Sequence, residues 1–132
     1  MILIAIIFLA MTASASARET YPSQFAQVDP AVSQWFRDQQ VPGRHYSCCS
    51  MADGTKADEE LRGDKIWTRF SYLRWANGAP FETLSEWMEV PDDVIIRDGK
   101  PNPMGGPVVW YYTEGLQGEV VKIRCFKPAD EG

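Results

Sequence analysis

The sequence has few histidines and cysteines, two residue types that enzymes often use for nucleophilic, metal-assisted or acid–base chemistry. It contains one histidine, His45, and three cysteines in 132 residues. It has no Gly-x-Ser-x-Gly elbow, no His-Glu-x-x-His, no phosphate-binding glycine loop and no Cys-x-x-Cys pair. These absences argue against the common hydrolase, metalloprotease, nucleotide-binding and thiol-redox classes. We expect no enzymatic activity and no cofactor.

Basic residues are also in the minority, and long apolar runs are lacking. Thirteen Lys and Arg face eighteen Asp and Glu, a net charge of −5, which argues against nucleic acid as a partner. The one apolar run, residues 2–11, is shorter than the about 20 residues that a membrane-spanning helix needs. It is followed by Ala15-Ser16-Ala17, a pattern typical of a signal peptide cleaved after Ala17. A retained short anchor is the alternative.

Cleavage would leave one domain that is periplasmic or secreted and not inserted into the membrane. We expect a flexible lead-in over residues 18–28, a single domain over residues 29–128 and a tail over residues 129–132. The stretch "VDPAVSQWFRDQQVPG" predicts a helix over residues 30–40, because Asp29 can cap it and Pro30 suits its first position. Val32, Trp35 and Phe36 recur at helical spacing and form its apolar face.

The second half of the chain has the pattern of β-strands. "DKIWTRFSYL" alternates apolar and polar positions, "LSEWMEVP" predicts a short strand that ends at Pro91, and turn residues occur at 98–99 and 102–106. Residues 108–112 and 121–125 predict a hairpin, in which Val121, Ile123 and Cys125 share the core face. The predicted fold class is α+β, with one N-terminal helix packed on a small antiparallel sheet or partial barrel.

The three cysteines predict one disulfide. Adjacent Cys48 and Cys49 cannot easily bond to each other, so we expect a bond from Cys48 or Cys49 to Cys125, in keeping with an oxidising compartment. One alternative is a zinc site of these cysteines with His45, or a copper(I) site that adds Met51. Another is a nucleophilic cysteine paired with His45. Because neighbouring cysteines seldom bind one metal, we expect no metal site and a solvent-facing His45.

Acidic and aromatic residues also admit two interpretations each. Residues 58–60 and 92–93 could suggest paired-carboxylate or calcium chemistry, but they lack calcium-loop spacing, and we interpret them as a solvated charged face. Four tryptophans could either stack on sugar rings or fill the core. They are Trp67, Trp75, Trp87 and Trp110. Trp75, beside turn residues, is the best candidate for exposure.

The order of several short motifs resembles a family of small exported proteins of alphaproteobacterial type. The motifs are Asp29-Pro-x-x-x-x-Trp35-Phe36, Cys48-Cys49 with Ala52-Asp53, Trp87-Met-x-Val-Pro91, Asn102-Pro103-x-Gly105 and Arg124-Cys125-Phe126-x-Pro128. Relatives often continue the cysteine motif as Ala-Asp-Cys, which gives four cysteines and two disulfides. Gly54 stands at that position here, so the resemblance implies that one of the adjacent cysteines has lost its partner. It supports the fold and the compartment and implies no activity.

These patterns favour a non-catalytic envelope domain that binds a protein or a glycan. The alternative is a thiol- or metal-binding periplasmic protein that uses Cys48 or Cys49 with His45, and a hydrolase acting on cell-wall sugars is a third. We predict the binding site in residues 71–87, which should form a surface loop or turn. This segment combines aromatic residues with arginine, as contact surfaces do; the residues are Tyr72, Arg74, Trp75 and Phe81. The opposing interpretation makes Trp75 and Phe81 a lid over the sheet.

Overall fold

A computed structural model describes residues 29–48 and 54–130 of the chain, and the structural statements below concern these residues. The elements are α1 (Pro30–Asp38), β1 (Gly54–Arg62), β2 (Lys65–Ala76), β3 (Ala79–Leu84), β4 (Met88–Glu89), the 3-10 helix η2 (Asp92–Val94), β5 (Val108–Glu114) and β6 (Val120–Lys127). The predicted signal peptide, the lead-in over residues 18–28, and Cys49 lie outside the described residues.

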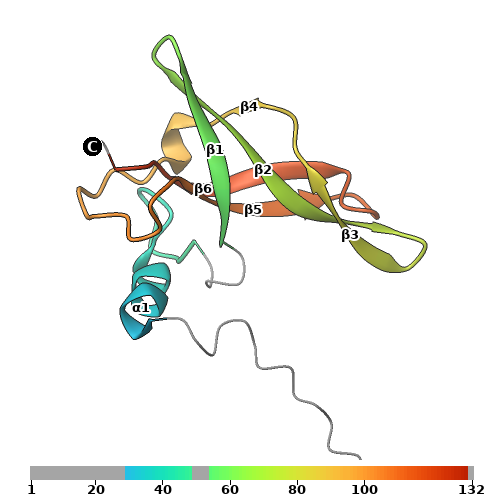
Figure 1. Ribbon diagram of the computed structural model, residues 1–132, viewed down its shortest axis with the longest axis horizontal. Helices are drawn as coiled ribbons and strands as arrows, with labels where there is room; N and C mark the ends of the chain where they lie inside the picture. Colours follow the sequence, from blue (N-terminus) through green and yellow to red (C-terminus); the bar gives the residue numbers. More distant parts are fainter. Residues whose placement is uncertain (1–28, 49–53, 131–132) are drawn as a thin grey trace, which may run out of the picture.

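The strands form one six-stranded sheet in which every pair is antiparallel. Its order is β3-β2-β1-β5-β6, and β4 pairs with β2 beyond the end of β3. Figure 1 shows α1 at one end of the molecule and the β2–β3 hairpin projecting from the other end. The prediction of one helix on an antiparallel sheet is therefore confirmed, with more of the chain in the sheet than expected.

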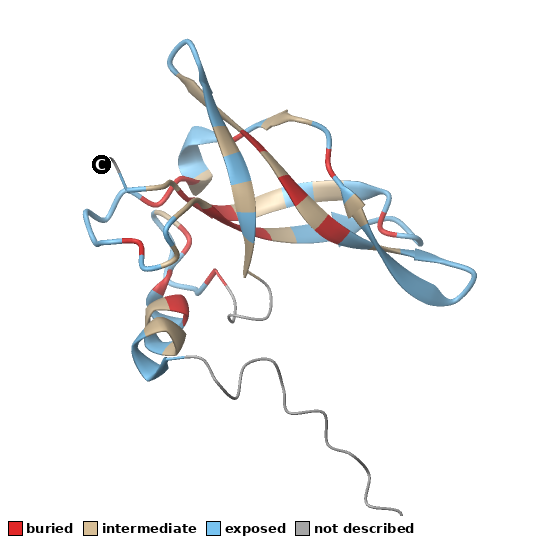
Figure 2. Cartoon of the chain, viewed as in Figure 1, coloured by how far each residue is buried: buried red, intermediate tan, exposed pale blue. Residues whose placement is uncertain are grey.

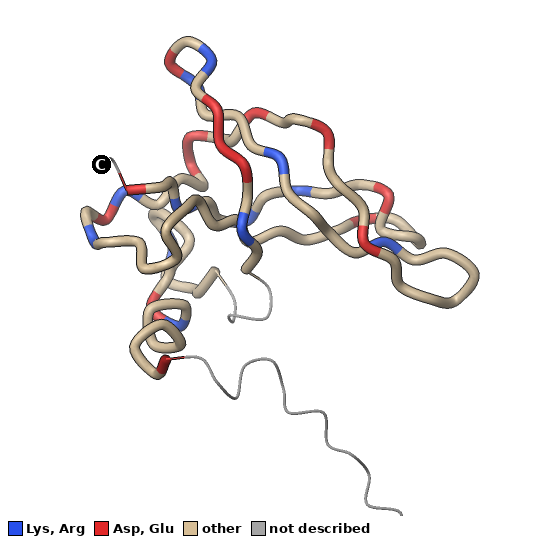
Figure 3. Tube along the Cα trace, viewed as in Figure 1, with Lys and Arg blue, Asp and Glu red and all other residues tan. Residues whose placement is uncertain are grey.

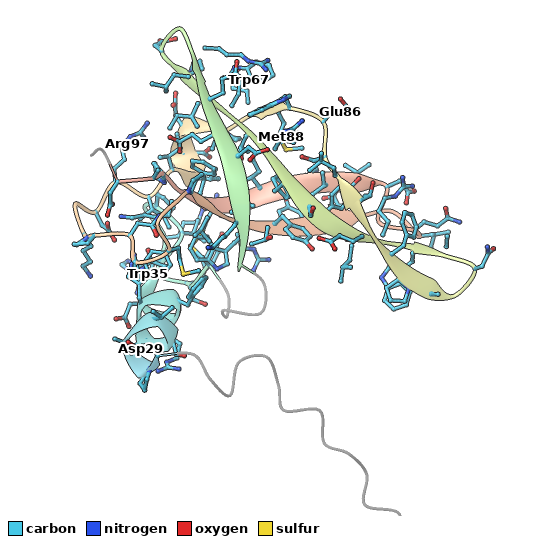
Figure 4. All side chains as sticks on the ribbon, viewed as in Figure 1. Asp29, Trp35, Trp67, Glu86, Met88 and Arg97 are labelled. Atoms are coloured by element: carbon cyan, nitrogen blue, oxygen red, sulfur yellow. A yellow bond between two sulfur atoms is a disulfide. The ribbon has the colours of Figure 1, made fainter. Side chains whose placement is uncertain are left out.

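Helix α1 begins where the sequence predicts and ends at Asp38 rather than at residue 40. The Asp29 carboxylate accepts a hydrogen bond from the Ala31 amide at 2.7 Å, and Pro30 occupies the first turn. This cap satisfies an amide that has no partner within the helix. The predicted apolar face packs on the sheet: Phe36 is buried, and Trp35, labelled in Figure 4, lies 6.0 Å from Trp110 of β5 between ring centroids.

The β5–β6 hairpin is covered on both faces, which explains the uninterrupted apolar run at the start of β5. Val108, Trp110 and Cys125 face a cluster that includes Phe36, Val41, Cys48 and Ile96. Val109 and Phe126 face a second cluster that includes Phe70, Tyr72, Val90 and Ile95. A strand buried on both faces needs apolar residues at every position. Figure 2 shows the buried positions concentrated where these strands cross β2.

Three details differ from the sequence predictions. Strand β1, with Asp58, Glu59 and Glu60, was not predicted at all. Residues 71–87 contain the predicted surface turn, at Asn77–Gly78, but most of the segment is strand, since β2 continues to Ala76 and the chain returns as β3. Only Met88–Glu89 forms the strand predicted from "LSEWMEVP". The third difference lies in β6.

A β-bulge in β6 makes the predicted common face of Val121, Ile123 and Cys125 wrong. Trp110 pairs with Cys125 while the next residue, Tyr111, pairs with Ile123, so Arg124 is an extra residue in the strand. One extra residue reverses the alternation of side chains beyond it. As a result Cys125 faces the α1 side, and Val121 and Ile123 pack against the opposite cluster.

Candidate binding surface

The candidate surface is built on a tight hairpin turn between β2 and β3. Asn77 and Gly78 both have positive φ, 52° and 75°. Two central residues of this kind form a type I′ turn, whose twist matches that of the flanking strands and which favours Asn-Gly. The turn fixes the register, with Ala76 opposite Ala79 and Arg74 opposite Phe81.

This register divides the side chains of the hairpin into two rows, because successive side chains in a strand point to opposite faces. One row, here called the outer face, contains Leu73 and Trp75 of β2 and Pro80, Glu82 and Leu84 of β3. Leu73 and Trp75 are each 51% exposed and Leu84 is 54% exposed. Three large apolar side chains therefore lie half-open to solvent on one face of two paired strands.

The opposite row, the inner face, contains three of the four residues predicted for the binding site. Tyr72 is 8% exposed and packs against the ring of Tyr111, with centroids 6.1 Å apart. The Arg74 guanidinium lies 5.9 Å from the Phe81 ring centroid, and Phe81 is 42% exposed. The predicted set therefore does not form one surface, since Trp75 lies on the other face.

Sequence reasoning missed Leu73 and Leu84 as members of the outer face. The signal was present in the alternation of "SYLRWA": once β2 is extended to Ala76, Leu73 and Trp75 fall on one side and Tyr72 and Arg74 on the other. The prediction that Trp75 is exposed is confirmed.

The turn between β5 and β6 anchors the hairpin from the side opposite β3. The Trp75 amide donates to the Gln117 carbonyl at 3.0 Å, and the Leu73 amide donates to the Tyr111 hydroxyl at 3.2 Å. The Gln117 amide in turn donates to the Glu119 carboxylate at 3.0 Å. Backbone hydrogen bonds to Glu119 and the nearby Arg74 charge lower the pKa of Glu119, which is therefore ionised at neutral pH. The outer face thus sits on an anchored backbone.

The remaining tryptophans are less accessible than Trp75. Trp110 is 1% exposed. Trp67 and Trp87 are half-buried and covered by arginines: the Arg62 guanidinium lies 4.4 Å from the Trp67 ring and 5.4 Å from the Trp87 ring. Figure 4 places Trp67 toward the β1–β2 turn, at the far end of β2 from the exposed hairpin. These rings already have a cation–π partner, so they serve this protein's own packing.

Charge near the outer face is mostly acidic. Glu82 lies on β3, and Glu86 follows it before β4; both are exposed. Figure 3 shows acidic positions in red along the β2–β3 hairpin and the segment that follows it. Arg74 is partly buried and lies on the inner face, so the open side of the hairpin is apolar with a negative charge at Glu82.

The cysteine prediction is resolved in favour of Cys48. Cys48 and Cys125 form a disulfide with Cα atoms 5.7 Å apart, and both residues are fully buried. The bond connects the loop after α1 to β6. His45 is exposed, as predicted. Because the disulfide takes up two thiols, the metal or thiol alternative now depends on Cys49 with His45, and it stays a prediction.

The carboxylates of β1 are directed to opposite sides of the strand. Asp58 pairs with Arg69 at 2.9 Å and Glu60 with Arg62 at 3.0 Å on the solvent side. Glu59 faces a groove of ≈ 810 Å³ lined by Leu61, Ile66, Ile95 and Lys127 among others, and burial raises its pKa. The groove contains no tryptophan, so the Trp-lined cleft that a cell-wall hydrolase would require is not formed there.

In residues 29–48 and 54–130, no three His, Cys, Asp or Glu side chains converge to hold a metal ion. No helix within these ranges is long and apolar enough to cross a membrane.

Comparison of the chain with protein-family models, with curated proteins and with solved structures finds no match.

Proposed function

We propose that this disulfide-linked α+β domain is an exported, non-catalytic protein that binds a partner protein through the outer face of the β2–β3 hairpin. The observation that carries the proposal is the row of half-exposed Leu73, Trp75 and Leu84 on an anchored backbone. Exposed apolar side chains that are contiguous, in contrast to single scattered ones, are typical of interaction sites. The Cys48–Cys125 disulfide supports export, because such bonds persist in oxidising compartments.

The energetics agree with a modest but specific contact. Full burial of a large apolar side chain is worth about 2 kcal/mol, so covering the open halves of three such side chains would contribute roughly 3 kcal/mol. Tryptophan is also among the residues that contribute most to protein interfaces. Two of the three side chains are aliphatic, and Glu82 is the one charged group in the row. A glycan would need several hydrogen-bonding side chains around Trp75, so a protein is the better fit.

Affinity capture from a periplasmic extract of the source organism tests the proposal. Immobilised wild type is compared with Leu73→Ser/Trp75→Ser, and bound proteins are quantified by mass spectrometry. The matched control is Tyr46→Ser/Leu61→Ser, which removes two exposed apolar side chains elsewhere on the surface. All three proteins must first show cooperative thermal unfolding.

We expect a protein that wild type and control retain equally and that the hairpin variant retains about thirtyfold less, the loss expected for about 2 kcal/mol. Equal retention by the hairpin variant would refute the proposed surface. Capture of cell-wall glycan in place of protein would refute the proposed class of partner.

A further inference from the structure

The two edge strands of the sheet, β6 and β3, differ in whether their outer backbone groups are covered. The outer edge of β6 is covered: the Ile96 amide donates to the Phe126 carbonyl at 2.8 Å, and Ile95 forms a parallel bridge with Phe126. β3 forms the other end of the sheet. Among residues 29–48 and 54–130, no backbone group bonds to its outer edge. An uncovered edge is a template for another strand.

The register identifies the groups that this edge presents. The amides of Leu73 and Trp75 point away from β3, since they bond to Tyr111 and Gln117. In an antiparallel pair, two opposite residues either both direct their backbone groups toward each other's strand or both direct them away from it. Glu82 and Pro80 are opposite Leu73 and Trp75, so the backbone groups of Glu82 and Pro80 point away from β2. Because the direction of the backbone groups alternates along a strand, those of Leu84, two residues after Glu82, also point away from β2. The edge therefore presents the carbonyl groups of Pro80, Glu82 and Leu84 and the N–H groups of Glu82 and Leu84. Pro80 has no N–H to present.

The same three residues carry side chains of the outer face. A strand added along β3 would place alternate side chains directly beside Leu84, Glu82 and Pro80, on the same face as Leu73 and Trp75, which lie one strand further away on β2. Facing side chains of opposite charge stabilise paired strands. The complementary strand therefore has a basic residue opposite Glu82 and apolar residues two positions to either side.

We propose that the β3 edge binds an extended segment of the partner protein as an added antiparallel strand with the pattern apolar-x-basic-x-apolar. This inference rests on the proposed function and names the chemistry of the partner. Backbone hydrogen bonds to Glu82 and Leu84 supply the affinity, and the outer face selects the side chains, as in other β-strand additions.

A second copy of the chain is the less suitable occupant. Two β3 edges paired symmetrically about Glu82 would place the two Glu82 carboxylates directly opposite each other, which is destabilising. The same pairing puts Pro80 opposite Leu84 of the other copy, whose carbonyl would then lack a donor. Pro80 and Glu82 thus disfavour self-association and still admit a basic, heterologous strand.

The probe for this inference is a capped nonapeptide, Ser-Thr-Val-Thr-Lys-Thr-Val-Thr-Ser, which meets the stated pattern. Its binding to the wild-type domain is measured by calorimetry and by the change in total tryptophan fluorescence. One analogue is N-methylated at the lysine, whose N–H would bond to Glu82. The control analogue is N-methylated at the threonine before it, whose N–H would point away from β3. Both modifications leave the protein unchanged.

We expect wild type to bind the probe, with about tenfold or greater weakening by lysine N-methylation and less than about threefold by threonine N-methylation. Leu84→Pro should weaken binding similarly, because it removes an N–H of the free edge. The variant should still fold, because β2 does not use this N–H and proline is tolerated on edge strands. Absence of binding at about 1 mM probe, equal effects of the two N-methyl groups, or dimerisation of the free domain through β3 would overturn the inference. Capture of a partner that depends on Leu73 and Trp75 and is weakened equally by Leu84→Ala, which keeps the edge N–H, and by Leu84→Pro would leave the proposed function intact and refute the added strand alone.

Discussion

Removal of the Cys48–Cys125 disulfide should cost a large part of the stability of this domain. The bond closes a loop between residues 77 positions apart in the sequence. The chain-entropy relation assigns a loop of this length about 4.5 kcal/mol at 25 °C. Domains of this size have a total stability of about 5–15 kcal/mol. The double variant Cys48→Ala/Cys125→Ala should therefore be close to the limit of stable folding.

Urea unfolding followed by tryptophan fluorescence measures the loss. With an m value of about 1.5 kcal/mol/M, the midpoint of the double variant should fall by about 3 M relative to wild type. Cys49→Ala is the matched control, because it removes the neighbouring thiol and keeps the bond; we expect it to change the unfolding free energy by less than about 0.5 kcal/mol. A loss below about 1 kcal/mol in the double variant, or an equal loss in Cys49→Ala, would refute the reasoning.

Three further predictions concern packing and charge. Gly54→Ala should cost about 1–3 kcal/mol in thermal unfolding, because its Cβ would lie 2.6 Å from Phe36 Cε1; wild-type stability would contradict that contact. Burial raises the pKa of Glu59, so wild-type stability should fall as the pH rises from the ordinary glutamate range through that raised pKa. Glu59→Gln should flatten the profile over the same range; parallel urea profiles would contradict this. Lys127 Nζ, with a side chain 6% exposed, bonds to Asp98 at 2.6 Å, and Asp98→Ala should cost about 2–3 kcal/mol at pH 7. Burial alone would raise the pKa of Asp98, but the hydrogen bonds from Lys127 and Lys100 outweigh burial and lower that pKa. The stability lost in Asp98→Ala should therefore shrink only as the pH falls through the lowered pKa. A loss independent of pH would count against the ion pair.

The sequence predicted those parts of the fold whose signals are local. The Asp29-Pro30 start of α1 depends on a cap and a first-turn proline within a few residues, and the covered strand β5 depends on its own apolar run. The Asn77–Gly78 dipeptide likewise marks a turn through its own backbone preferences. These features need no knowledge of distant residues.

The missed features depend on partners far along the chain. Asp58 and Glu60 disfavour a strand by propensity, yet β1 forms because β2 and β5 pair with it and arginines neutralise its outward carboxylates. The Arg124 bulge follows from the pairing of β6 with β5. The Cys48–Cys125 disulfide joins residues 77 positions apart, and the sequence does not reveal which of two adjacent cysteines lies beside so distant a partner.

The candidate surface was predicted only in part for the same reason. Trp75 and Phe81 were placed at the surface by their neighbouring turn residues, and both are exposed. Their separation onto opposite faces, and the contribution of Leu73 and Leu84, follow from the β2–β3 register.

Residue-resolved hydrogen exchange of the free domain tests most directly whether the hairpin presents an open edge. The amides of Glu82 and Leu84 should exchange at nearly unprotected rates, while those of Phe81 and Thr83, which face Arg74 and Tyr72 across the β2–β3 ladder, should exchange slowly. Addition of the nonapeptide should slow exchange at Glu82 and Leu84 without changing the other pair. Protection of Glu82 and Leu84 in the free monomer, equal to that of Phe81 and Thr83, would show that the edge is already occupied and would contradict the proposed binding site.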